Sequence, residues 1–140
     1  MRDIVGLLLV LIFVMLALLH IYWAVGGDWG KAASVPTVSG KALFRPSRVA
    51  TLLVAAALLV ASMVIAGAMG WIGAGPSKMF TLLTFAMSAV FLLRAIGDFK
   101  HAGFFKAASD SPFAYWDTRL YSPLCLFIAA SAFFVAWRKA

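Results

Sequence analysis

The chain has 140 residues, of which 64% are hydrophobic and 12% are charged, with a formal net charge of +7. Soluble domains average about 45 to 50% apolar and about 25% charged residues, so this composition indicates an integral membrane protein. The basic residues stand singly between apolar blocks, which argues against nucleic acid and favours the anionic headgroups of membrane lipids as partners. The single cysteine, Cys125, excludes an intramolecular disulfide and a dithiol redox pair.

Four apolar stretches are long enough to cross a hydrocarbon core of about 30 Å, which takes about 20 helical residues. Because backbone groups in lipid must be bonded within the segment, we expect transmembrane helices at about residues 4–25, 49–71, 79–97 and 122–137. In "YSPLC", Ser122 is the expected N-cap of the last helix and Pro123 its first residue. The predicted fold is an all-α integral membrane four-helix bundle, with residues 1–140 as one transmembrane domain.

With four spans, the loops at residues 26–48 and 98–121 lie on one side of the membrane. Four of the five acidic residues fall on that side, namely Asp28, Asp98, Asp110 and Asp117. The two loops also hold seven lysines and arginines against four on the other side, so the positive-inside rule predicts that this polar face is cytoplasmic and the termini lie opposite. Small residues along the second and fourth spans would let helices approach closely, in a monomer or in a homo-oligomer.

Arg94 and Asp98 stand four positions apart at the end of the third span. This spacing puts both on one face of a helix, where an exposed ion pair contributes about 0.3 to 0.5 kcal/mol. An acid at a helix C-terminus opposes the macrodipole, so stability alone does not explain the pair. Two interpretations stay open: a functional site, because ionisable groups at the membrane are functional candidates, or a pair that joins the third helix to a neighbour.

"HIYW" at residues 20–23 ends the first span. His20 and Trp23 share a helix face, so a cation or a sugar-like ring could meet the indole plane and the imidazole together, with Tyr22 beside them. The alternative is that His20 bonds to a neighbouring helix for packing, while Trp23 belongs to the aromatic belt.

"FAYWDTRLYSPLC" at residues 113–125 places Asp117, Arg119 and Tyr121 just before the fourth span. Arg119 near a helix N-terminus is unfavourable unless an acid pairs with it, and Asp98 or Asp117 is the expected partner. The segment is either a re-entrant or interfacial loop that covers the bundle or a plain amphipathic connector.

The other polar residues carry weaker patterns. Lys100, His101 and Lys106 are expected to be solvated or to face lipid headgroups, and Cys125 to be a packing residue. The histidines and acids lack metal-ligand spacing, and no Gly-rich phosphate loop or dinucleotide fingerprint is present, so we expect neither a metal nor a cofactor.

Taken together, "HIYWAVGG", "LLRAIGDF" and "FAYWDTRLYSPLC" resemble a family of small bacterial four-helix membrane proteins known as domain-of-unknown-function 3995. The resemblance covers nearly the whole chain and implies a four-span protein of the bacterial inner membrane, without implying an activity. It places the family's motif positions at His20, Tyr22, Trp23, Arg94, Asp98, Asp117, Tyr121 and Pro123.

Two functions compete. In the first, the protein binds or converts an amphipathic, lipid-like molecule in one recess at the polar face. His20 would then carry a proton with Asp98 or Asp117 as its partner, Arg94 or Arg119 would hold an anion, and Tyr22, Trp23 and Tyr121 would shape the wall. In the second, it is a structural or accessory subunit whose ion pairs specify helix register. A channel fits less well, because the second span carries Thr51 and Ser62 as its polar groups and so offers no polar path.

Overall fold

The computed structural model describes residues 1–73, 78–107 and 110–137. Three long helices are α1 (Arg2–Ala24), α3 (Arg48–Met69) and α4 (Lys78–Ile96). The fourth is built from three segments that follow one another without a break, namely α5 (Pro112–Trp116), the π-helix η1 (Asp117–Tyr121) and α6 (Ser122–Trp137). Between α1 and α3 lie the short helix α2 (Lys31–Ser34) and an antiparallel hairpin, β1 (Thr37–Val38) and β2 (Lys41–Ala42), in which Thr37 lies opposite Ala42.

Four helices of the described chain are long and apolar enough to cross a membrane: Arg2–Ala24, Arg48–Met69, Lys78–Ile96 and Pro112–Trp137. The predicted all-α fold with four spanning helices is therefore confirmed, and the protein is a multi-pass membrane protein by the length and composition of its helices. The ends of the first three helices agree with the predicted ranges to within two residues.

The predicted range of the last helix, residues 122–137, coincides with α6, but Ser122 is not its N-cap, because α5 and η1 precede it without a break. The helix begins at Pro112, after Ser111, whose side chain accepts a hydrogen bond from the backbone N–H of Ala114. A serine followed by proline at the first helical position is the same start pattern that Ser122 and Pro123 carry. Of the two Ser-Pro pairs in the chain, the earlier one caps the helix and the later one lies inside it.

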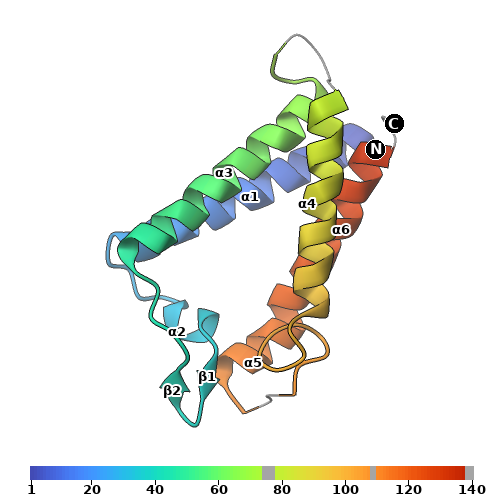
Figure 1. Ribbon diagram of the computed structural model, residues 1–140. Helices are drawn as coiled ribbons and strands as arrows, with labels where there is room; N and C mark the ends of the chain where they lie inside the picture. The colour runs from blue at the N-terminus through green and yellow to red at the C-terminus, as the bar shows by residue number, and fades with distance from the viewer. Residues whose placement is uncertain (74–77, 108–109, 138–140) are drawn as a thin grey trace.

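The helices form two pairs, α1 with α3 and α4 with α6 (Figure 1). The pairs converge at the end of the molecule where both chain termini lie, and they diverge toward the loops (Figure 1). The buried apolar cluster is at the converging end and includes Leu9 and Phe13 of α1, Ile65 of α3, and Ile128 and Val135 of α6. The core therefore holds the two pairs together at one end and leaves the polar loops to organise the other.

Two polar contacts reinforce this packing. At the start of α1, Arg2 donates hydrogen bonds to the carbonyl oxygens of Val135 at 3.3 Å and Ala68 at 3.0 Å, near the ends of α6 and α3. The last carbonyls of a helix have no partner within it, so a guanidinium is well suited to them. Within the second pair, the Ser88 hydroxyl donates to the Ala129 carbonyl oxygen at 2.7 Å.

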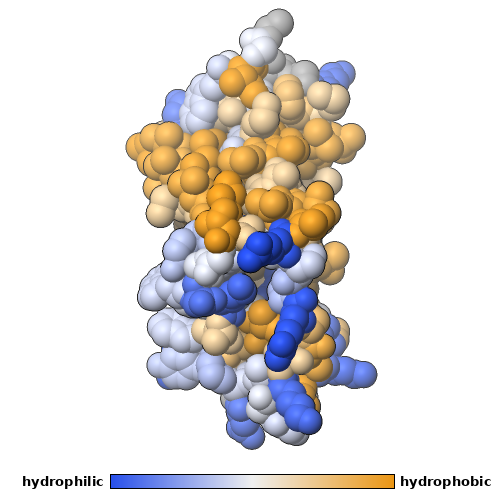
Figure 2. Space-filling view, turned by 90° about the vertical axis from the view of Figure 1, so that its left-hand side faces the viewer, coloured by the Kyte–Doolittle hydropathy of each residue, from blue (hydrophilic) through white to orange (hydrophobic). Residues whose placement is uncertain are grey.

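The surface separates by polarity along the length of the molecule. Figure 2 shows hydrophobic residues collected in a band across the middle of the face formed by α1 and α3, with mostly hydrophilic residues below it, over the loop that contains α2 and the hairpin. A band of this kind is what the hydrocarbon of a bilayer selects, because lipid tails cannot solvate polar side chains.

Candidate functional site

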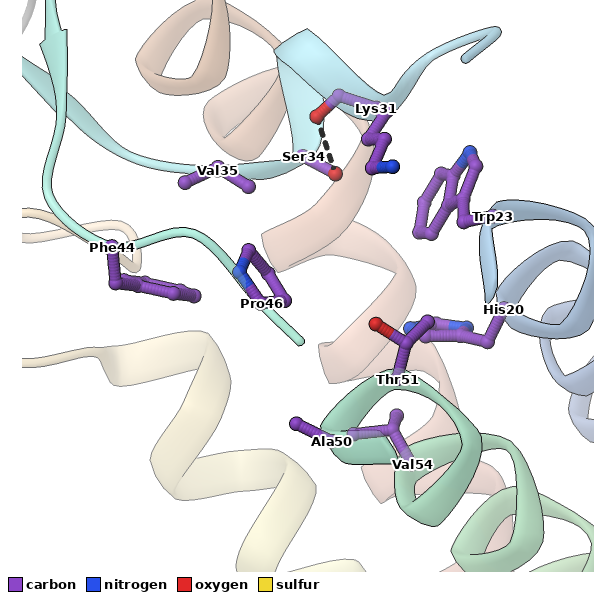
Figure 3. A pocket seen from close by; sticks show the side chains of 10 residues that line it. All are labelled: His20, Trp23, Lys31, Ser34, Val35, Phe44, Pro46, Ala50, Thr51 and Val54. Carbon is purple, nitrogen blue, oxygen red and sulfur yellow. Dashed lines mark hydrogen bonds between the residues drawn. The ribbon is translucent and has the colours of Figure 1, made fainter. Parts of the chain in front are cut away.

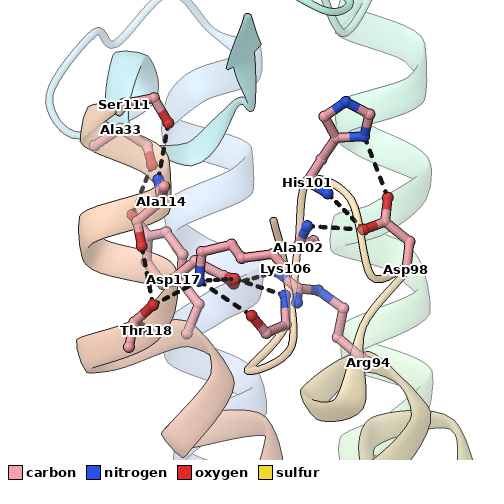
Figure 4. Close-up of polar contacts among 12 residues, drawn as sticks. Ala33, Arg94, Asp98, His101, Ala102, Lys106, Ser111, Ala114, Asp117 and Thr118 are labelled. Atoms are coloured by element: carbon pink, nitrogen blue, oxygen red, sulfur yellow. Dashed lines mark hydrogen bonds and ion pairs between the residues drawn. The ribbon is translucent and has the colours of Figure 1, made fainter. Parts of the chain in front are cut away.

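Asp117 is the centre of a charge network at the loop end (Figure 4). Its side chain is fully buried, and its Oδ1 accepts a hydrogen bond from Arg94 Nη2 at 2.9 Å. Its Oδ2 accepts from the backbone N–H of Gly103 at 2.7 Å and lies 3.2 Å from the ammonium of Lys106, whose side chain is 5% exposed. Two cations and one backbone donor therefore compensate one buried carboxylate, as a buried charge requires.

The π-helix explains why Asp117 points inward. In η1 the backbone N–H of Ser122 bonds to the carbonyl of Asp117, so residues five apart share a face, and both of these side chains are buried. Pro123 has no N–H to bond the carbonyl four residues earlier, and its ring would crowd that carbonyl in a regular helix. The proline at the end of this turn thus accounts for the local widening of the helix.

Asp98 builds the loop that brings Gly103 to Asp117. Its Oδ1 accepts hydrogen bonds from the backbone N–H groups of Lys100, His101 and Ala102 at 3.0, 2.7 and 2.9 Å (Figure 4). These bonds, those from Ala102 and His101 above all, hold the pKa of Asp98 well below its ordinary range. The carboxylate is therefore a fixed charge that folds the loop.

Two glycines let this loop close tightly. Gly97 follows α4 with a φ of +90°, and Gly103 has a φ of +93°. A Cβ on Gly97 would collide with the carbonyl oxygen of Ala102, and one on Gly103 would collide with the backbone of Gly97. The sequence therefore needs glycine at both positions to place the Gly103 N–H against Asp117.

The predicted pairing of charges was wrong in two places. Arg94 bonds to Asp117, on the neighbouring helix, and Asp98 bonds to the backbone of its own loop. Arg119 has its guanidinium 4.0 Å from the centre of the Tyr115 ring, a cation–π contact on the exposed side of η1. Lys106, expected to be solvated, is instead a partner of the buried acid.

Some polar atoms of this region have no partner. Among the described residues, Arg94 Nη1 and Ser122 Oγ are buried without a hydrogen bond. The Tyr121 hydroxyl, by contrast, donates to the Ala33 carbonyl oxygen of α2 at 3.2 Å, and so ties the last helix to the first loop. Tyr121 therefore connects the network to a second feature of this end, a pocket.

The pocket has a volume of about 330 Å³ and lies where α1 and α3 meet the first loop. Its lining combines polar groups with apolar walls, from His20, Trp23, Lys31, Ser34, Val35, Phe44, Pro46, Ala50, Thr51 and Val54 (Figure 3). It is half open to the outside, and its lining is mostly apolar. Concave sites with apolar walls and a few convergent polar groups are the usual form of small-molecule sites.

The imidazole of His20 has a defined tautomer. Its Nδ1 lies 2.7 Å from the Leu16 carbonyl oxygen, which can only accept, so Nδ1 carries the hydrogen. In the neutral ring Nε2 then keeps its lone pair, and the ring extends into the pocket on the side of Thr51 (Figure 3). Trp23 packs edge-on against this ring at 5.0 Å between centroids, and its Nε1–H donates to the Trp29 carbonyl oxygen at 2.8 Å. The alternative interpretation, in which His20 bonds to a neighbouring helix, is wrong for Nδ1, because its bond to the Leu16 carbonyl stays within α1.

The predicted site residues thus form two groups rather than one recess. His20 and Trp23 line the pocket, whereas Arg94, Asp98, Asp117 and Tyr121 belong to the network and its connections. Tyr22 is exposed and lies over Gly27, and Arg119 also faces outward. Sequence reasoning missed Lys31 in the pocket and Lys106 and Gly103 in the network.

These features define the class: a small four-helix membrane protein with a charge network and a pocket at one end of the bundle. Residues 13–132 match the model of the family described as "Protein of unknown function (DUF3995)", and the chain belongs to this family. The resemblance seen in the three sequence blocks is therefore confirmed. No curated protein and no solved structure matches the chain significantly.

Proposed function

We propose that the protein binds an amphipathic, lipid-like molecule in the pocket between α1, α3 and the first loop. The observation that carries the proposal is the lining, in which Lys31 and His20 stand among apolar walls such as Val35 and Phe44. The polar groups would hold a headgroup, and the apolar walls, at the edge of the hydrophobic band, would hold a chain that enters from the bilayer.

Binding fits this arrangement better than conversion. Conversion by the predicted residues would need Asp98 or Asp117 beside the imidazole of His20. The Nδ1 of His20 instead bonds to the Leu16 carbonyl oxygen, and Asp117 is paired with Arg94 and Lys106. The carboxylate of Asp98 is bonded by its own loop, so the three catalytic candidates serve three separate roles.

The experiment compares native mass spectra of the purified chain and of Ala50→Trp, which fills the pocket. We expect a co-purifying amphiphile on the wild type and its loss from Ala50→Trp. Ala57→Trp, also on an exposed part of α3 but outside the pocket lining, is the matched control and should retain the amphiphile. Equal lipid adducts on all three proteins would refute the proposal.

A second candidate is a structural or accessory subunit without a ligand. The Asp117 network favours this role, because its charges are paired inside the protein. Together with the Tyr121 bond to the first loop, the network fixes α4, the last helix and two loops relative to one another. This role predicts that the native spectra carry no specific amphiphile, and that substituting Asp117 reduces folded protein rather than a binding activity.

We also propose that the membrane is the bacterial inner membrane and that the loop end faces the cytoplasm. The bias of lysine and arginine toward the first and third loops supports this. Lys106 is used inside the protein, and the bias persists without it. A cysteine placed at Ser39, in the exposed hairpin turn, should react with thiol reagents in inside-out vesicles and stay protected in intact cells.

A further inference from the structure

Most of the charged side chains around the pocket are positive. Lys31 contributes to the lining, and Lys41, Arg45 and Arg48 follow in the same loop and at the start of α3. Asp28 is the acid of this segment, and it is 91% exposed, with its carboxylate 3.9 Å from the Lys31 ammonium. An exposed pair at that distance contributes little, so Lys31 remains available to a stronger anionic partner.

The position of Lys31 suits a headgroup contact. Its side chain descends from α2 beside Trp23 toward the space enclosed by Pro46 and Thr51 (Figure 3). The adjoining open pocket, lined in part by Lys31, Val35, Phe44, Arg45 and Pro46, continues from this mouth along the first loop. Lys31 thus lines both pockets, and the open one also holds Arg45 and the exposed Asp28.

The size of the pocket limits the chain of the ligand. Its volume of about 330 Å³ is near the lower end of the roughly 300 to 1,000 Å³ that is usual for small-molecule sites. A compact head with the first carbons of one chain fits such a pocket better than a head with two acyl chains. The rest of the chain would leave past Val54, which lines the pocket and is 45% exposed.

We propose that the ligand is a single-chain amphiphile with a carboxylate or phosphate head, and that Lys31 contacts this head. The inference rests on the proposed function and adds the charge and the chain number of the ligand. His20 Nε2 offers the head an acceptor, so a protonated phosphate oxygen or a neighbouring hydroxyl would bond there.

The test titrates the full chain in nonionic detergent with four probes: myristate, tetradecyl phosphate, neutral monomyristoylglycerol and two-chain phosphatidylglycerol. Apparent dissociation constants are read from native mass spectra. For Lys31→Gln we expect both single-chain anions to bind about tenfold more weakly, the loss of one charge-assisted hydrogen bond, while the neutral probe changes less than about twofold. Comparing the two anions tells which head the pocket prefers.

Lys41→Gln is the matched control, because it removes the same charge from the same loop outside the pocket lining. An equal loss in Lys41→Gln, an equal loss for the neutral probe, or tight binding of phosphatidylglycerol would each overturn the inference. Ala50→Trp distinguishes a failure of this inference from a failure of the proposed function. If Ala50→Trp blocks every probe but Lys31→Gln leaves the preference for anionic heads intact, this inference alone fails. If Ala50→Trp blocks no probe, the proposed function fails as well.

Discussion

Arg94 and Asp117 are 23 positions apart in the chain, and their side chains meet at 2.9 Å between Nη2 and Oδ1, joining the last turn of α4 to η1. Asp117 and Lys106 are buried whereas Arg94 is 36% exposed, so removing the carboxylate leaves one buried cation without its acid. We therefore expect Asp117→Asn to lower the free energy of unfolding by about 3 to 5 kcal/mol.

This loss is measured by thermal unfolding in detergent, on protein that elutes as a single monodisperse species. Asp28→Asn removes an exposed carboxylate of the first loop and should change the midpoint little. The double variant Arg94→Met, Asp117→Leu should lose less than the sum of the single variants, because the Arg94–Asp117 interaction is counted in both of them, although Lys106 loses its acid in the double variant too. A fully additive result would show that the pair does not interact.

The same side chains show what a sequence can predict. The four spans follow from hydropathy alone, since lipid permits no other use of runs of this length. Arg94, Asp98 and Asp117 of the network were also singled out, because charges near the membrane are expensive. Their partners were not, because the partner of Arg94 depends on how α4 packs against the last helix, and spacing within one helix favoured Asp98.

Other parts of the site gave weaker patterns. Lys106 lies in a loop whose path is set by Asp98 and two glycines, so its burial follows from tertiary structure. The sequence does contain a sign of the π-helix. Two Ser-Pro pairs cannot both start one continuous helix, so the later proline must lie inside it and disturb its hydrogen bonds. No sequence pattern predicted the place of Lys31 in the pocket, because that place depends on how the first loop folds back over α3.

The loop after α4 should depend on pH through Asp98. Because the pKa of Asp98 is lowered in the folded protein, its stabilising effect is present above the unfolded value of about 3.9 and is lost as pH falls below it. We expect the loop amides of His101 and Ala102 to stay protected from hydrogen exchange between pH 8 and pH 5, after correction for intrinsic rates. Protection should fall below about pH 4.

Asp98→Asn is the control for this assignment. It keeps one carbonyl acceptor for the three N–H groups and removes the titrating charge. Its protection should be lower than that of the wild type at pH 7, and the difference should shrink as the wild-type carboxylate is protonated. A difference that stays constant with pH would exclude Asp98 as the titrating group.

Gly97 should tolerate no side chain. Gly97→Ala adds a Cβ at a φ of +90° and drives it into the Ala102 carbonyl, so it combines backbone strain with a steric clash. Gly73 has a similar φ of +81° with open space around it. Gly73→Ala should therefore cost about 1 to 2 kcal/mol from strain alone, and Gly97→Ala clearly more. Equal thermal midpoints for the two variants would mean that the loop around Asp98 is looser than its contacts indicate.

Arg2 should stabilise the converging end of the bundle. Its guanidinium donates to the Ala68 and Val135 carbonyl oxygens, so Arg2→Ala leaves the ends of α3 and α6 without these donors. We expect a loss of about 1.5 to 3 kcal/mol, typical of hydrogen bonds from a charged group, measured by thermal unfolding in detergent. Arg2→Lys should recover part of it, since a point charge serves one carbonyl better than two. Lys78→Ala, a change of an exposed cation at the start of α4, should have little effect, and a loss as large as that of Arg2→Ala would indicate a general effect of surface charge instead.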